Sequence, residues 1–202
     1  MFDPTTALAT LKTGVPAFKQ ALQALLAERH KIARDVLLKR IRKGEPWAVA
    51  EDQMAGMLLT FFRAAEEGAA RENLDLLAQV IARAEQEPTF APVEFKRWHR
   101  VLSEMNRDEI LVLGRYLFGI QQAKGTTDEA NQLGLAGEQQ SVKDLVGKDK
   151  PFRDAREVRS CLTALQRTGI VMNNGGLDGG TITPMPGLFD LARLVKFGDA
   201  LI

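Results

Sequence analysis

The stretch DAREVRSCLTALQRTGIVMNNGGLDGGTITPMPGLFDLARL, residues 154–194, carries the clearest structural signal in this chain of 202 residues. Asp154, followed three residues later by Glu157, predicts the start of a helix that ends at Gly169. Residues 170–172 and 181–183 predict two short strands joined by the glycine-rich turn NNGGLDGG. Either of two prolines, at positions 184 and 186, then opens a last helix. With a short helix expected over 141–147, the predicted order is helix, helix, hairpin, helix.

This order and its motif resemble the winged-helix superfamily. Many bacterial members carry a leucine-bearing helix that ends in threonine-glycine, then a strand, a turn and the pattern T-x-x-G-x-x-L. The first part is matched here by Leu162, Leu165, Thr168, Gly169, Ile170 and Val171. The second part is matched, with one extra residue between threonine and glycine, by Thr183, Gly187 and Leu191. The resemblance covers residues 141–202, and residues 107–122 are available as the module's first helix.

The resemblance implies that residues 155–168 form a recognition helix that enters the DNA major groove. At about 100° per residue, the buried face would hold Ala155, Val158, Leu162 and Leu165, with Cys161 at its edge. The opposite, polar face suits guanine edges and phosphates, with Arg159 nearer the side. Its residues, the candidate nucleic-acid or partner-binding set, are Arg156, Arg159, Ser160, Thr163 and Arg167.

Two other interpretations of this face stay open. A solvated helix face carries arginine and serine without any ligand, and the predicted hairpin turn has no Lys or Arg but does have Asp178. Winged helices also serve as protein–protein modules. A second resemblance, to bacterial abortive-infection alpha-type proteins, implies an interaction module in a stress or phage-defence assembly. That likeness is carried by Leu162, Leu165, Gly169, Ile170, Thr183 and Gly187.

Residues 1–122 predict a helical bundle, with helices expected before Gly14 and over 16–43, 46–68, 69–85, 93–105 and 107–122. Asn106 with Glu109 predicts a capping box at the start of the last of these. The helix over 16–43 shows one broad apolar stripe that predicts burial. The stripe consists of Phe18, Leu22, Leu25, Leu26, Ile32, Ala33, Val36, Leu37 and Ile41. The bundle as a whole would support self-association as a homodimer, or partner binding. Residues 123–140, AKGTTDEANQLGLAGEQQ, predict a polar linker or loop.

Composition narrows the function classes. The 27 Lys+Arg against 26 Asp+Glu argue against a protein that coats nucleic acid nonspecifically. Cys161 is the single cysteine, which fits a reducing compartment. The N-terminus shows no secretory pattern, and the longest apolar run, residues 54–62, is about half of a bilayer span. We therefore expect a cytoplasmic protein without an integral membrane span.

No catalytic, metal or cofactor motif is found in the sequence. His30 and His99 are far apart and stand at no metal-ligand spacing. The glycine-rich turn lies between strands, and no G-x-x-x-x-G-K-[ST] occurs. Two further segments have alternative interpretations. The basic helix end KRIRK, residues 39–43, complements a helix dipole or contacts phosphate or anionic lipid. The segment MAGMLLTFF, residues 54–62, predicts the central helix of the bundle, or else a subunit or membrane surface. We expect a non-enzymatic binding or regulatory protein.

Overall fold

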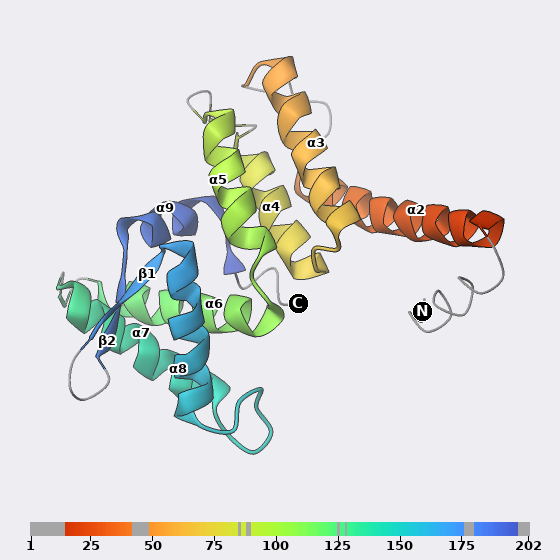
Figure 1. Cartoon of the computed structure of the whole chain (residues 1–202). Helices are drawn as coiled ribbons and strands as arrows, with labels where there is room; N and C mark the ends of the chain where they lie inside the picture. The colour runs from red at the N-terminus through yellow and green to blue at the C-terminus, as the bar shows by residue number, and fades with distance from the viewer. Residues whose placement is uncertain are drawn as a thin grey trace. The chain divides into compact units, whose positions relative to one another are not determined.

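The computed structural model describes residues 15–41, 49–84, 86–87, 90–124, 126–127, 129–175 and 180–197. Within these ranges the chain is mostly helical, with eight α-helices and one small antiparallel hairpin near the C-terminus (Figure 1). The prediction of a mostly helical chain with a small hairpin is confirmed. The chain divides into two compact units, Met1–Lys96 and Arg97–Ile202.

Among the described residues, three helices lie wholly within the first unit: α2 (Val15–Arg40), α3 (Glu51–Glu67) and α4 (Arg71–Ala84). Each of them contacts the other two. Helix α3 ends at Gly68, whose φ of 96° is left-handed, and the Gly68 N–H bonds to the carbonyls of Ala64 and Ala65. Glycine adopts this conformation without the steric penalty of a Cβ, so the glycine predicted as a helix stop does end the helix.

The most buried helix of this unit is α4, not α3. Helix α3 buries one face only, and Leu59 on its other side is 63% exposed. The prediction that residues 54–62 form the central helix is therefore wrong. Those residues are apolar on most sides, but the neighbouring helices cover one side. Helix α4 instead buries Asn73, Leu74, Leu76, Leu77, Ala78, Gln79, Val80, Ile81 and Ala84.

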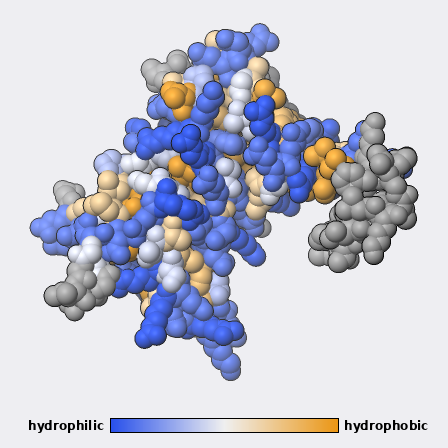
Figure 2. Space-filling model, viewed as in Figure 1, coloured by the Kyte–Doolittle hydropathy of each residue, from blue (hydrophilic) through white to orange (hydrophobic). Residues whose placement is uncertain are grey.

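The apolar stripe predicted on α2 is covered over part of its length. Ala33, Val36 and Leu37 are buried, whereas Leu22 is 43% and Ile32 38% exposed. Leu22 lies in the N-terminal half of α2, which extends away from α3 and α4 (Figure 1). Figure 2 shows hydrophobic residues at the surface of α2, in the right part of the view.

The basic end of α2 has a structural partner. Arg40 donates from Nε and Nη2 to the two carboxylate oxygens of Asp75 on α4, at 2.9 and 2.7 Å. Gln79 adds a third hydrogen bond to the same carboxylate, at 3.0 Å. A bidentate arginine–carboxylate pair fixes geometry as well as charge, so Arg40 joins α2 to α4. Of the other residues of KRIRK, residues 42 and 43 lie outside the described ranges.

The second unit begins within α5 (Pro92–Ser103), which spans the division of the chain. Then follow α6 (Arg107–Ala123), α7 (Ala130–Leu145), α8 (Ala155–Ala164), the 3₁₀ turn η1 (Leu165–Thr168), β1 (Val171–Asn174), β2 (Thr181–Pro184) and α9 (Pro186–Leu194). The capping box at Asn106 is confirmed, with both reciprocal bonds to Glu109 at 2.9 Å. Pro186 occupies the first turn of α9.

The hairpin packs on helix α7. Strands β1 and β2 pair antiparallel, with Val171 opposite Pro184 and Asn174 opposite Thr181. Helix α7 contacts β2 and α6, and it also contacts α8. The buried Tyr116 of α6 donates its hydroxyl proton to the carbonyl of Ile182 on β2, at 2.8 Å. This bond ties the hairpin to the helical layer beneath it.

The predicted linker over 123–140 is wrong for residues 130–140, and the helix expected over 141–147 is the end of a longer helix rather than a separate one. Residues 130–145 form one helix, α7, whose glycines serve close packing. A Cβ on Gly134 would lie 2.1 Å from the Ile182 carbonyl oxygen, and one on Gly137 would lie 2.6 Å from the Tyr116 ring. Glycine therefore lets β2 and α6 approach the helix backbone. The prediction failed because glycines among polar residues are also the typical composition of a loop. Residues 107–122, predicted in the bundle or as the first helix of the C-terminal module, and residues 123–140, predicted as a linker, both lie in the C-terminal unit.

Two predicted features fall outside the described ranges: the helix before Gly14 and the hairpin tip at residues 176–179, with Asp178. Among the described helices, none is long and apolar enough to cross a membrane.

Candidate binding face on helix α8

Helix α8 begins at the predicted cap. The Asp154 carboxylate accepts from the backbone N–H groups of Arg156 and Glu157, at 2.8 and 3.1 Å. Glu157 in turn accepts from the backbone N–H of Arg153, at 2.7 Å. These bonds satisfy N–H groups that a helix start leaves without intrahelical partners. The predicted start of the helix is confirmed.

The inner face of α8 is apolar and fully covered. Val158, Leu162 and Leu165 are each 0% exposed, and the helix contacts α6 and α7. Ala155, predicted on this face, is exposed because it stands in the first turn, beside the cap. Cys161 is half-buried at the edge, as predicted.

The end of the helix departs from the prediction. The α-helix stops at Ala164, and residues 165–168 form the 3₁₀ turn η1, closed by a bond of 2.6 Å from the Thr168 hydroxyl to the Leu165 carbonyl. A 3₁₀ turn advances about 120° per residue against about 100° in an α-helix. Over the three steps from residue 164 to residue 167, the difference turns Arg167 by about 60° away from its expected direction.

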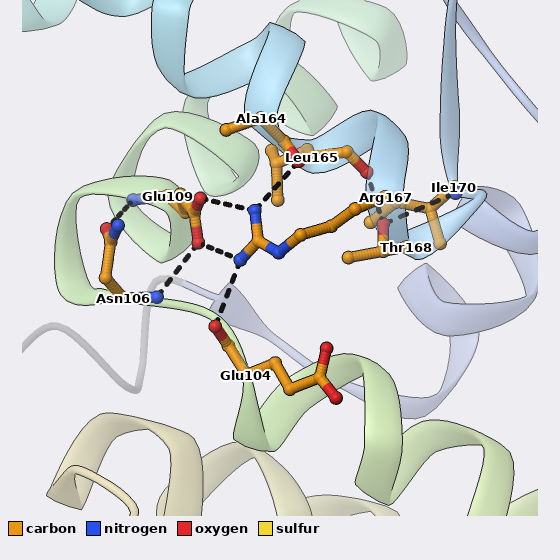
Figure 3. A network of polar contacts seen from close by, with 8 residues as sticks. All are labelled: Glu104, Asn106, Glu109, Ala164, Leu165, Arg167, Thr168 and Ile170. Carbon is orange, nitrogen blue, oxygen red and sulfur yellow. Dashed lines mark hydrogen bonds and ion pairs between the residues drawn. The ribbon is translucent and has the colours of Figure 1, made fainter.

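Arg167 consequently points into the protein's own structure (Figure 3). Its two terminal nitrogens each bind one carboxylate oxygen of Glu109, both at 2.6 Å. The same nitrogens donate to the backbone carbonyls of Ala164 and Glu104, at 2.8 and 3.0 Å. Arg167 therefore donates four hydrogen bonds that join η1 to the start of α6.

The electrostatics of Glu109 follow from this clamp. Burial alone would raise the pKa of its carboxyl, since only 4% of its side chain is exposed. Hydrogen bonds from Arg167 and from the Asn106 backbone, with the charge of Arg167, outweigh burial and hold that pKa below its ordinary value. The same contacts raise the pKa of Arg167. Both groups are charged at neutral pH, as a structural ion pair requires.

Arg159 is also engaged within the unit. Its guanidinium donates to the carbonyl of Gly180, next to strand β2, and lies 3.9 Å from the carboxylate of Glu138 on α7. Its side chain is 35% exposed. The side position predicted for Arg159 places it over the hairpin and α7, where it braces α8 against both.

Three of the five predicted residues stay on an open face. Arg156, Ser160 and Thr163 are exposed, at the i, i+4 and i+7 positions of α8. Lys148 and Arg153 are exposed in the segment before the helix. We call these five residues, Lys148, Arg153, Arg156, Ser160 and Thr163, the α8 face. Arg159 and Arg167 do not belong to it.

Sequence reasoning did not find the Glu109 partnership. Glu109 stands 58 residues before Arg167, and its capping box already gave it a complete local explanation. A carboxylate uses several lone pairs, so one bond to the Asn106 backbone left room for a second partner. That spare capacity was the one available signal.

The other candidate chemistries find no support in the described ranges. No group of three or more His, Cys, Asp or Glu residues is arranged there to hold a metal ion. His30 is 46% exposed, and its Nε2 lies 2.8 Å from the Glu66 carboxylate. Burial first, and then the charges of Asp108, Glu109 and Glu157, raise the pKa of the Cys161 thiol, which disfavours the nucleophilic thiolate.

Comparison of the chain with protein-family models, with curated proteins and with solved structures found no match.

Proposed function

We propose that the unit Arg97–Ile202 is a winged-helix-like, non-enzymatic module that contacts nucleic-acid phosphates through the α8 face. The supporting observation is the exposure of that face on a helix whose other side is locked to α6 and α7. The order α6, α7, α8, β1, β2 resembles the three helices and wing of this superfamily. A rigidly held helix with one open polar face is what groove binding requires.

The contacts favour backbone binding over sequence reading. Lys148, Arg153 and Arg156 supply positive charge, and phosphate contacts give affinity without sequence information. Two of the three arginines predicted for this face, Arg159 and Arg167, are held by Glu138 and Glu109, which leaves Arg156 as the one that could add a bidentate guanine contact. Beside Arg156, the face offers only Ser160 and Thr163 to base edges, and hydroxyls discriminate weakly between bases. The proposed module therefore binds duplex DNA with modest sequence preference.

The first unit supports a further part of this proposal, a homodimer through α2. Leu22 and Ile32 are substantially exposed, and Leu25 and Leu26 between them are half-buried. Their spacing puts them on one side of the helix. An apolar helix face of this kind suits a second copy, and two copies would double the number of phosphate contacts. Sedimentation velocity of the chain beside Leu22→Glu/Ile32→Glu tests it: an unchanged sedimentation profile overturns the dimer.

A protein partner on the same face is the second candidate. It is favoured by the internal pairing of Arg159 and Arg167, which removes two positive charges from contact with DNA. Glu157 is exposed on the same helix and lowers the positive potential further. An interaction module of this kind would still be non-enzymatic and would use the same three α8 residues.

Fluorescence anisotropy of a labelled duplex separates these functions. We would titrate it with the whole chain, with Arg153→Ala/Arg156→Ala and with the control Lys96→Ala/Arg100→Ala. The control removes two charges from exposed positions of α5. The proposal expects salt-sensitive binding that the first variant weakens at least about tenfold and the control leaves unchanged. Absence of binding at low salt, or an equal loss of binding in both variants, would contradict contact with DNA through the α8 face. The next test would then be a protein pull-down that compares the whole chain with an Arg156→Ala variant.

A further inference from the structure

A trough with an apolar floor and a basic rim runs along helix α6, away from the α8 face. Its two adjoining hollows share Leu117, Gln121 and Ala192. The larger has a volume of about 690 Å³ and the smaller about 350 Å³. The lining of α6 extends from Leu111 to Lys124, which spans about 20 Å of helix at 1.5 Å per residue.

The opposite wall comes from α9 and the segment after it. Phe197 is held against α6 at a glycine: a Cβ on Gly114 would lie 2.9 Å from the Phe197 Cβ. Val195 and Phe197 are buried, so this wall is fixed rather than a loose end. At the other end, the Lys124 ammonium lies 4.4 Å from the ring centre of Phe189. This cation–π contact keeps a positive charge at the rim.

The exposed surface of the trough is apolar at its centre. Phe118 is 42% exposed, although phenylalanine normally buries a large area. Leu111, Phe189 and Ala192 beside it are half-buried. The apolar surface of duplex DNA is confined to small groups such as thymine methyls, which would not cover such a floor, so the basic rim here suits a different ligand from that of the α8 face.

The charge of the rim is one-sided. Arg115, Lys124, Arg193 and Lys196 line the trough, against a single lining carboxylate, Asp190, which lies 3.6 Å from Arg193. Arg115 lies 3.8 Å from Asp144 of α7, at a site where 48% of the arginine side chain is exposed. Long contacts at exposed sites are weak and exchange readily with an incoming carboxylate.

We propose that this trough binds an acidic amphipathic helix of a partner protein. The trough length of about 20 Å accommodates apolar anchors at i, i+3 or i+4 and i+7, which is how helices dock in grooves. The occupant's leucine or phenylalanine side chains cover Phe118 and Leu111. Its glutamates or aspartates meet Arg115, Lys124 and Arg193. This function is independent of the α8 face and does not rest on the proposed contact with DNA.

The test uses the whole chain and a labelled synthetic helix with leucines at i, i+3, i+4 and i+7 and glutamates elsewhere. A second peptide replaces every glutamate with lysine. The variants are Phe118→Glu and Arg193→Glu, which place a repelling charge in the trough. The matched control is Leu135→Glu, because Leu135 lies on α7 and is 46% exposed. Circular dichroism of each variant establishes that it is folded.

The proposal expects the acidic peptide to bind and the lysine peptide not to bind. Phe118→Glu and Arg193→Glu should each weaken binding about tenfold or more, while Leu135→Glu and Arg153→Ala/Arg156→Ala leave it unchanged. Equal binding of both peptides, no binding of either, or equal loss in the control overturns it. If a chain ending at Phe197 binds and the full chain does not, residues 198–202 are the occupant and the proposal is wrong. The same holds for a second copy if Phe118→Glu abolishes self-association.

Discussion

Arg167 binds the buried carboxylate of Glu109 with both terminal nitrogens, at 2.6 Å each, and so joins the end of the α8 segment to the start of α6. Glu109 is at the same time the third helical residue of the Asn106 capping box. The same carboxylate therefore caps the start of α6 and also binds the segment that follows α8. The residue whose sequence position suggested DNA contact has a structural role instead.

Loss of this pair should cost stability. Arg167→Ala leaves the Glu109 carboxylate buried with fewer partners, and we expect the free energy of unfolding to fall by about 1–3 kcal/mol. This loss is smaller than that expected for a wholly buried ion pair because 39% of the Arg167 side chain is exposed to solvent. Urea unfolding measures the change. Arg156→Ala, an exposed change on the same helix, should stay within about 0.5 kcal/mol, and equal losses in both would contradict the pairing.

The pair should also make stability depend on acid pH. Because the pKa of Glu109 is lower in the folded chain than its ordinary 4.5, its contribution is complete above that value. It is lost as pH falls below 4.5 through the lowered pKa, since the unfolded chain then takes up the proton first. Glu109→Gln should be less stable at neutral pH and show a shallower decline below pH 4.5. Parallel unfolding curves for the two chains at every acid pH would refute this.

Cys161 should react slowly. Burial and three neighbouring carboxylates raise the pKa of its thiol, so the thiolate fraction at neutral pH is small. Alkylation of the native chain by iodoacetamide should be slower than alkylation in urea, and mass spectrometry follows both rates. The single cysteine makes the assignment unambiguous. Equal native and unfolded rates would show that the α8 edge is open.

The glycines of α7 should resist enlargement. In Gly134→Ala the new methyl group would meet the Ile182 carbonyl oxygen, so we expect a loss of about 1–3 kcal/mol as β2 shifts. Gly56→Ala on α3 is the control, because a Cβ there meets nothing within 4 Å and alanine favours a helix. That change should stabilise by about 0.5–1 kcal/mol. Thermal unfolding of both distinguishes close packing from helix propensity, and a stabilised Gly134→Ala would contradict the described contact.

Local signals in the sequence predicted local structure well. Asn106 with Glu109 and Asp154 with Glu157 each marked a helix start, because a cap is made by residues close in the chain. Gly169, in a left-handed conformation with φ 71°, marked the helix end. The hairpin was predictable for the same reason, since two short apolar runs flank a glycine-rich turn.

Features that depend on distant residues were not predictable. Gly134 and Gly137 are typical of a loop when only the sequence is considered. Their role in a helix becomes clear only from the close approach of Ile182 and Tyr116. The orientation of Arg167 depends on a 3₁₀ turn and on a carboxylate 58 residues away. The trough beside Phe118 forms where α9 packs near α6, so the pattern of either segment alone does not predict it.

Tyr116 gives the molecule a built-in optical reporter. It is the only tyrosine of the chain, and its hydroxyl is bonded to the Ile182 carbonyl. Burial, and to a smaller extent the charge of Glu138, raise its pKa above the ordinary 10.0, so the neutral form persists while β2 stays on α6. Because this pKa is higher in the folded than in the unfolded chain, the free energy of unfolding is unaffected by Tyr116 below pH 10.0 and declines as pH rises beyond it. In an alkaline titration, the pH at which tyrosinate absorbance rises would therefore report when Tyr116 loses its buried position against β2, without any added label.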